Sequence, residues 1–295
     1  MTRETTPLKA DLHTHSYFSD GSHAPGYVLE QARQNGVTHL ALTDHDCIDG
    51  YLQAADDYQD GQPALIPGVE ISTLWNNLEI HVLGLCFNPS DQNLKRLLDC
   101  QQQRRRERLQ AIEAKLVKAG IIGLGDYIRD LPCVSPGRAH VARFLAGQTR
   151  STARKAFRSL ARNGRFHVAA AWSAMDSAVS FIRQAGGIAV LAHPHRYPLN
   201  RRKLSRLLEE FHAAGGEGLE ICCSNMAANE LENLAALSLE HGLWASAGSD
   251  FHTSEATWMD IGRLQQLPES VKKNAIWSHP RWHFPDHGGH CNGPG

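Results

Sequence analysis

Apolar residues follow two different periods along the chain, and the two periods alternate. Short apolar runs predict seven strands, at 10–13, 39–43, 64–69, 80–86, 188–192, 218–222 and 244–248. Helical periodicity is found between them, at 25–35, 49–58, 174–185, 200–214 and 227–241. Strands that alternate with helices form a parallel α/β sheet, either closed as a barrel or open and doubly wound. Because the chain has seven such strands and no Gly-x-Gly-x-x-Gly motif, we predict a (β/α)7 barrel.

The alternation stops between about 90 and 168, where only helices are predicted. They span about 90–119, 138–147 and 152–162. We therefore predict a barrel formed by residues 1–100 and 169–277 and interrupted by a helical insertion at 101–168. Residues 278–295 are rich in Gly, Pro and His without an apolar period, and are predicted to be a disordered tail.

Charge is distributed unevenly, although the net charge is only −1. Residues 101–167 carry 15 Lys and Arg against 4 Asp and Glu, a balance of +11, and the rest of the chain has 15 against 27, a balance of −12. A basic segment inserted in an acidic one indicates an anionic partner.

Other features of the composition narrow the location. No apolar run approaches the ~20 residues of a membrane span, and the N-terminus lacks the apolar core of a secretory signal. Seven cysteines without a Cys-x-x-Cys pair fit a reducing compartment. We expect a cytoplasmic protein without a membrane partner, and no obligate protein partner is evident.

Histidines and acids gather where the predicted strands end. They are His13, His15, Asp20, His45, Glu70, His193, Asp250 and His252. In a β/α barrel the carboxyl ends of the strands meet at one rim, and residues two apart on a strand point the same way. Any one of these residues alone could be an ordinary surface or core side chain. Because His and acidic residues recur at the ends of several strands, the pattern predicts a metal cluster.

His81 is the exception, because it begins its apolar run instead of ending it. We infer that the barrel is distorted and that residues 69–84 fold back as a hairpin. Asp44 and Asp46 flank His45, and we interpret them as caps of the following helix.

Several of these segments resemble a known family. The resemblance to the polymerase and histidinol phosphatase (PHP) superfamily is carried by DLHTHSYFSDGS, ALTDHDCIDGY, IPGVEIS, IHVLGL, VLAHP and SAGSDFH. In addition, GRAHVARFL in the insertion and AHPHRY after it are similar to a branch of nucleotide bisphosphatases and 5′-to-3′ exoribonucleases. In departure from that branch, His195 replaces a glycine, and RNGRFHVAAAW replaces Tyr and Pro positions.

The resemblance implies the PHP fold and three divalent ions, most often Mn²⁺ and sometimes Fe²⁺ or Zn²⁺. It also implies how the ligands are shared. The first ion would be held by His13, His15, Glu70 and Asp250, the second by Asp20, His45 and His252, and the third by Glu70, His81 and His193.

This ligand set suits phosphoryl chemistry. Three divalent ions bring +6 and the three carboxylates return −3, so the site attracts a phosphate dianion. A metal-bound hydroxide would be the nucleophile, and we assign no side chain to that role, because the chain has neither Gly-x-Ser-x-Gly nor a P-loop.

Basic residues near this site are candidates for substrate binding. Arg138 lies at a predicted helix start, which favours anions, and Arg196 follows His193 closely. We predict that both clamp a second phosphate, with His140 and Arg143 as weaker candidates; the alternative is an ordinary solvated helix face. The Arg104–Arg106 run and Arg154–Arg165 are expected to be solvated. Aromatic side chains available for stacking are Tyr127, Phe144, Phe157 and Phe166.

The leading hypothesis is a phosphohydrolase of 5′-phosphorylated nucleotide ends. Its substrates would be nucleoside 3′,5′-bisphosphates and short 5′-phosphorylated RNA, with trimming of ribosomal RNA 5′ ends as one use. One alternative is a histidinol-phosphate phosphatase, which leaves the basic insertion unexplained. Another is a non-catalytic nucleic-acid-binding module, against which the intact ligand set argues.

Overall fold

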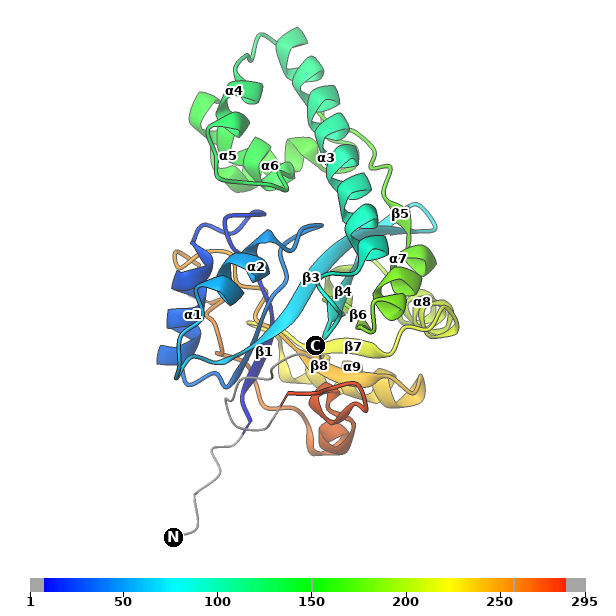
Figure 1. Ribbon diagram of the computed structural model, residues 1–295. Helices are drawn as coiled ribbons and strands as arrows, with labels where there is room; N and C mark the ends of the chain where they lie inside the picture. The colour runs from blue at the N-terminus through cyan, green and yellow to red at the C-terminus, as the bar shows by residue number, and fades with distance from the viewer. Residues whose placement is uncertain (1–7, 150, 257, 285–295) are drawn as a thin grey trace.

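A computed structural model describes residues 8–149, 151–256 and 258–284 (Figure 1). The described strands are β1 (Ala10–Thr14), β2 (His39–Leu42), β3 (Ala64–Trp75), β4 (Leu78–Leu85), β5 (Ser173–Ala174), β6 (Ile188–Leu191), β7 (Gly218–Cys222) and β8 (Trp244–Ala247). They are ordered β1-β2-β3-β4-β6-β7-β8 in one sheet, and β5 pairs with β3 outside this path.

The edge strands β1 and β8 meet and nearly close the sheet into a barrel. Just beyond β8, Asp250 donates its backbone N–H to the carbonyl oxygen of His13 at 2.8 Å. In return, the backbone N–H of His15 donates to the carbonyl oxygen of Phe251 at 2.9 Å. The predicted distorted seven-stranded barrel is confirmed, and β5 is a further strand of two residues.

β3 and β4 form a long hairpin that reverses the direction of one barrel strand. Its turn is made by Asn76 and Asn77, whose φ angles of 48° and 61° belong to the tight hairpin turns that Asn adopts readily. β4 consequently runs antiparallel to both β3 and β6. The start of β4 therefore reaches the rim where the parallel strands end. This confirms the fold-back inferred from His81.

Helices cover the outside of the barrel close to the predicted ranges. They are α1 (Pro25–Gln34), α2 (Asp49–Asp56), α7 (Met175–Gln184), α8 (Arg201–Ala213) and α9 (Ala228–Glu240). Fully buried Leu12, Ile66, Leu83 and Val190 fill the barrel interior. The larger apolar cluster lies between the sheet and α7, α8 and α9.

The predicted disordered tail is in part packed against the barrel. Trp282 and Phe284 lie on the interior apolar cluster, and Arg281 donates from Nη1 to the carbonyl oxygen of Gly187 at 2.6 Å and pairs with Glu217. The prediction of disorder is therefore wrong for residues 278–284, because Ser278 ends a short 3-10 helix and the aromatic side chains that follow have apolar partners. Residues 285–295 lie outside the described part of the chain.

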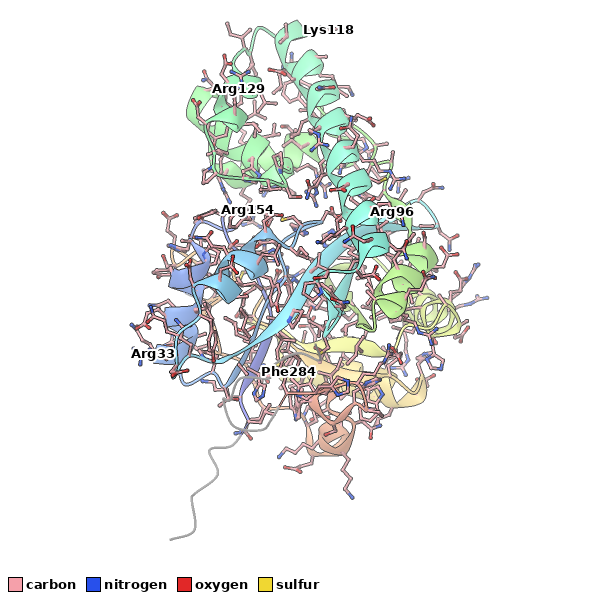
Figure 2. All side chains as sticks on the ribbon, in the orientation of Figure 1. Arg33, Arg96, Lys118, Arg129, Arg154 and Phe284 are labelled. Carbon is pink, nitrogen blue, oxygen red and sulfur yellow. The ribbon has the colours of Figure 1, made fainter. Side chains whose placement is uncertain are left out.

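Four helices, α3 to α6, stand above the rim of the barrel (Figure 1). Their bounds are α3 (Gln92–Lys118), α4 (Leu124–Arg129), α5 (Arg138–Thr149) and α6 (Ala153–Leu160). They share an apolar cluster of their own, and Lys118 and Arg129 mark the end farthest from the barrel (Figure 2). We call α3 to α6 the helical insertion. No helix in the described part of the chain, α3 included, is long and apolar enough to cross a membrane.

α3 connects the insertion to the barrel. Its first turns place Leu94, Leu97 and Leu98 in the barrel core, whereas Ile112 and Leu116 belong to the cluster of the insertion. α3 therefore begins at Gln92, within residues 1–100, which we assigned to the barrel.

A buried ion pair anchors the middle of α3 to the barrel. Arg105 is only 6% exposed. It donates from Nε to Asp46 Oδ2 at 2.7 Å and from Nη2 to Ser72 Oγ at 2.9 Å. The expectation that the arginine run is solvated is wrong for Arg105. The interpretation of Asp46 as a helix cap is also wrong, because α2 begins at Asp49 without a side-chain cap.

We expect Asp46→Asn to destabilise the fold by about 3 kcal/mol, because it leaves Arg105 buried without a countercharge. Asn accepts the φ of 51° found at Asp46 as readily as Asp does, so the loss reports the charge. Chemical denaturation measures it. Asp57→Asn, at an exposed position just beyond α2, is the control and should change stability by less than about 0.5 kcal/mol. Equal stabilities of the two variants would show that the pair does not anchor α3.

Candidate metal centre and active-site cleft

The barrel rim brings together all the histidines and acids predicted as ligands. β1 carries His13 and leads into His15, and the following loop supplies Asp20. The other strands contribute at or near their rim ends, with His45 after β2, Glu70 in β3, His81 in β4, His193 after β6, and Asp250 and His252 after β8. β4 reaches this rim with its beginning because it runs antiparallel.

Ligand atoms of these residues form three overlapping groups, with all atoms of a group within 4.8 Å of one another. The groups are His13, His15, Glu70 and Asp250; His15, Asp20, His45 and His252; and His45, Glu70 and His81. They match the expected sharing closely, except that His15 joins the second group and His45 the third. His193 is outside the groups, but its Nε2 lies 2.9 Å from Glu70 Oε1.

Two ligands occupy unusual backbone conformations. His193 and Asp250 have φ angles of 30° and 54°, in a region that residues other than glycine rarely adopt. Such conformations persist where the surrounding structure enforces them, and they concentrate at functional sites. At both positions the chain turns sharply as it leaves a strand, which directs the side chain into the rim.

Buried acids behind the ligands orient them. Glu220, in the middle of β7, contacts His13 Nδ1 through Oε1 at 2.9 Å and accepts the backbone N–H of His193 at 2.6 Å. This leaves His13 Nε2 facing the cluster, as second carboxylates commonly do for metal-binding imidazoles. Sequence reasoning missed Glu220; the available signal was an acid inside the apolar run GLEIC.

Asp44 orients the loop that carries Asp20. Its carboxylate accepts the hydroxyls of Ser16 and Ser19, each at 2.6 Å, and the backbone N–H of Ser16 at 2.8 Å. The interpretation of Asp44 as a helix cap is therefore wrong, because its oxygens are used by this loop.

The carboxylates packed around His13 and His15 raise the pKa of both imidazoles. Burial by itself lowers the pKa of an imidazole and raises that of a carboxyl. Against burial, the carboxylates of Glu220, Glu70 and Asp250 raise the pKa of His13 well above its usual value, and hydrogen bonds to Asp250 and Glu70 raise the pKa of His15 to about 10. Protons and divalent cations therefore compete for the same imidazoles, and a cation binds more tightly as pH rises.

The donor set fits divalent metal ions. Asp20 Oδ1, His45 Nδ1 and Glu70 Oε2 are buried and have no hydrogen-bond partner of good geometry among the described residues. His13 Nε2 and His15 Nε2 face each other at 3.1 Å, a spacing that suits two ligands of one ion with bonds of about 2 Å. Imidazole and carboxylate ligands without thiolate are typical of catalytic Mn²⁺, Fe²⁺ and Zn²⁺ sites.

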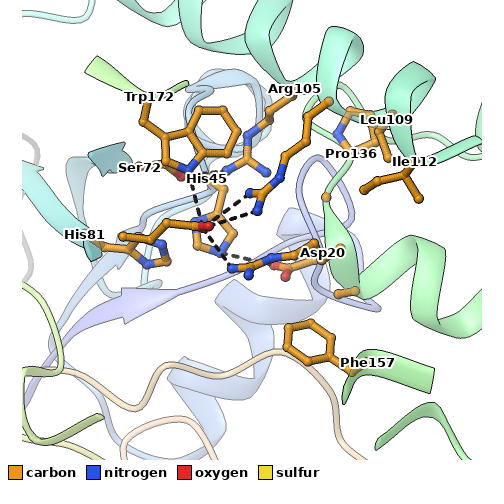
Figure 3. Close-up of a pocket in the computed structure, with 15 residues that line it drawn as sticks. Asp20, His45, Ser72, His81, Arg105, Leu109, Ile112, Pro136, Phe157 and Trp172 are labelled. Atoms are coloured by element: carbon orange, nitrogen blue, oxygen red, sulfur yellow. Dashed lines mark hydrogen bonds and ion pairs between the residues drawn. The ribbon is translucent and has the colours of Figure 1, made fainter. Parts of the chain in front are cut away.

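A cleft opens between the cluster and the helical insertion (Figure 3). The barrel contributes Asp20, His45 and His81 to its lining. Across from these ligands the cleft is lined by Arg105, Arg108, Arg138, Phe157 and Trp172, among others. Trp172 is nearly buried and lies under the guanidinium groups of Arg105 and Arg108 at 5.2 and 5.5 Å from its ring.

Glu79 fixes two of these arginines. The guanidinium of Arg108 donates two hydrogen bonds to the Glu79 carboxylate, from Nη2 to Oε1 at 2.8 Å and from Nη1 to Oε2 at 3.3 Å. Its Nε donates to the carbonyl oxygen of Val168. Arg138 reaches Glu79 Oε2 with Nη2 at 3.0 Å. Among the described residues, none accepts a hydrogen bond from Nε or Nη1 of Arg138, whereas all three nitrogens of the Arg108 guanidinium donate within the protein.

The other predicted substrate contacts are placed less favourably. Arg196 pairs with the ligand Asp250, and Arg143 donates to the backbone carbonyl of Asp20. His140 is buried, its Nδ1 accepts the backbone N–H of Gly137 at 3.0 Å, and burial lowers its pKa to about 4. Of the predicted contacts, the cleft lining includes Arg138 alone.

A cluster of imidazoles and carboxylates at the rim of a distorted barrel, facing an arginine-lined cleft, defines a metal-dependent hydrolase of phosphoric esters. The PHP-domain pattern matches residues 11–165. The chain is 38% identical over 277 residues to the 5′-3′ exoribonuclease Rnm of Escherichia coli (strain K12), covering 92% of this chain and 94% of that protein. The chain belongs to the PHP-domain family.

Further similarities extend over the same length. The 3′,5′-nucleoside bisphosphate phosphatase of Chromobacterium violaceum is 36% identical and covers 90% of this chain and 94% of its own. A solved structure of an amidohydrolase from Chromobacterium violaceum, with bound sulfate and no metal, has a TM-score of 0.84 at 35% identity and covers 92% of this chain and 95% of its own.

We expect Glu220→Gln to lower the affinity for Mn²⁺ roughly 10- to 100-fold, although Glu220 belongs to none of the ligand groups, because a carboxamide orients and polarises His13 less strongly. Calorimetric titration of chelator-treated protein with Mn²⁺ measures the change. Glu217→Gln is the matched control, because Glu217 also pairs with a histidine, His279, but outside the cluster. Unchanged affinity in Glu220→Gln would exclude an orienting contribution of this residue.

Proposed function

We propose that the chain hydrolyses phosphate from the 5′ end of nucleotides, acting on nucleoside 3′,5′-bisphosphates and short 5′-phosphorylated RNA. The observation that carries this proposal is the cleft that joins the ligand cluster to the arginines of the insertion. In a substrate with two phosphates, one phosphate can lie at the ligand cluster and the other at the arginines of the cleft. Histidinol phosphate has one phosphate and a cationic remainder, which has no favourable contact with these arginines. The names of the similar proteins support the same substrates.

We further propose three divalent ions, with Mn²⁺ preferred over Fe²⁺ and Zn²⁺. The first would be held by His13, His15, Glu70 and Asp250, the second by Asp20, His45 and His252, and the third by Glu70, His81 and His193. When bound, such ions activate water and stabilise the charge that develops on the phosphate. The contribution of the chain is to hold its imidazoles in a fixed orientation, as Glu220 does for His13.

Arg138 is the residue that we assign to the second phosphate of the substrate. Glu79 holds its Nη2 in place, and its Nε and Nη1 donors are available for an anion. Arg196 is half-exposed beside Asp250, and we keep it as the second proposed clamp on the same phosphate. His140 and Arg143 remain weaker candidates.

The purified protein with Mn²⁺ should release the 5′ phosphate of adenosine 3′,5′-bisphosphate and leave adenosine 3′-monophosphate, which chromatography separates. His15→Ala should reduce turnover at least ~100-fold, because His15 belongs to two of the ligand groups. His241→Ala, at the end of α9 and outside the cluster, is the control and should retain activity.

Two results would contradict the proposal. Turnover of histidinol phosphate with none of the bisphosphate or of short RNA would favour the histidinol phosphatase. Retained RNA binding in His15→Ala, with no turnover by the unmodified protein, would favour a binding module.

We expect Arg138→Gln to lower kcat/KM for adenosine 3′,5′-bisphosphate roughly 10- to 100-fold, the effect of losing a charged hydrogen bond. Adenosine 5′-monophosphate lacks the second phosphate, so its kcat/KM should change by less than about twofold in the same variant. Arg129→Gln is the control, because Arg129 is an exposed arginine of the insertion that pairs with Asp126. Equal losses on both substrates would remove the assignment of Arg138 to the second phosphate.

A further inference from the structure

The cleft has two unlike ends. One end holds the ligands and the arginines that face them. The other is apolar, and Figure 3 shows Leu109, Ile112, Pro136 and Phe157 on the side away from His81 and Trp172. The lining of the cleft also includes Ala139. A substrate that consists only of phosphates and a sugar leaves such a surface uncovered.

Phe157 is the exposed aromatic ring of this end. It is 39% exposed, although it follows the buried Ala156 on α6. The other aromatic candidates of the insertion are used for packing, since the Tyr127 and Phe144 rings contact each other at a tilted angle with centres 5.5 Å apart and Phe166 is buried in the same cluster. Phe157 therefore differs from them in facing the cleft instead of the core.

Arg138 connects this ring to the polar end of the cleft. Its guanidinium carbon lies 5.6 Å from the centre of the Phe157 ring, and the same guanidinium reaches Glu79. A group that stacks on the ring is thereby brought next to the arginine that we assign to the second phosphate. In a nucleoside 3′,5′-bisphosphate, the base and the 3′ phosphate are attached to the same sugar.

We propose that Phe157 is the stacking platform for the nucleobase of the substrate, and that this subsite accepts all four bases. The inference rests on the proposed function and specifies the part of the substrate that occupies the apolar end. Stacking needs only a flat π-face, which every base has. Selection among bases needs donors or acceptors at their edges, and the side chains of Leu109, Ile112, Pro136 and Phe157 offer none.

The test compares substrates with and without a base. They are the 3′,5′-bisphosphates of adenosine, cytidine, guanosine and uridine, and the 3′,5′-bisphosphate of 1-deoxyribose. Phe157→Ala should lower kcat/KM for the four nucleotides roughly 5- to 100-fold, by similar factors, and change it less than about twofold for the compound without a base. Phe157→Trp should restore most of the loss, whereas Phe157→Leu, which keeps apolar bulk, should not.

The control variant is Ile122→Ala, at an exposed apolar side chain of the insertion outside the cleft lining, 71% exposed. It should leave all five substrates unaffected. If Phe157→Ala loses equally on the compound without a base, Phe157 acts by holding Arg138 and the stacking proposal is wrong. A loss confined to one or two bases would overturn the claim that the subsite accepts all four.

A fluorescence measurement separates this proposal from the proposed function. The base of 2-aminopurine riboside 3′,5′-bisphosphate loses fluorescence when it stacks, and the experiment uses Mg²⁺ in place of Mn²⁺ to avoid quenching by the metal. If the unmodified protein hydrolyses none of the bisphosphates, the proposed function fails. The stacking proposal then stands if the protein quenches the probe and Phe157→Leu does not, and it fails if the two proteins behave alike.

Discussion

The metal site depends on the contacts between the Glu70 carboxylate and the imidazoles around it. The two carboxylate oxygens lie within 3.3 Å of nitrogen atoms of five imidazoles, which belong to His13, His15, His45, His81 and His193. His13 and His15 lie in β1 or just after it, and the other three lie in or just after β2, β4 and β6, so the contact brings residues at four strands to one carboxylate. One buried carboxylate cannot satisfy five imidazoles by hydrogen bonds alone, and shared divalent cations remove that conflict. Fold and metal binding are therefore expected to be coupled.

The reversed strand β4 accounts for both His81 and the insertion. Because β4 begins at the rim, it ends at the opposite pole, and the chain must return along the outside of the barrel. α3 makes this return with 27 residues, about 40 Å of helix, whereas the eight residues of β4 span about 27 Å. The excess carries the chain past the rim and holds α4, α5 and α6 over the cluster (Figure 1). One antiparallel strand thus supplies a ligand and also the cover of the active site.

Periodic features were predictable from the sequence, and isolated ones were not. Ligands such as His13 and Asp250 follow apolar runs, and a strand end is visible in the pattern. Glu220 was missed because a single acid inside an apolar strand has no period, and its meaning depends on His13, which is 207 residues away. Arg105 was misjudged because a helix pattern shows which residues share a face but not whether another element covers it. Asp46, the residue that covers it, lies on a loop before α2.

Net charge overstates how cationic the cleft is. Residues 101–167 have a balance of +11, yet Arg105 is neutralised by Asp46 and Arg108 by Glu79. Lys118 and Arg129 lie at the far end of the insertion (Figure 2). Among the described residues, Arg138 is the cleft arginine that contacts its countercharge through one nitrogen only, Nη2. Long-range attraction of a polyanion and local binding of its phosphate are therefore separate properties. The first is a sum over the insertion that salt screens, and the second depends on one guanidinium whose position Glu79 sets.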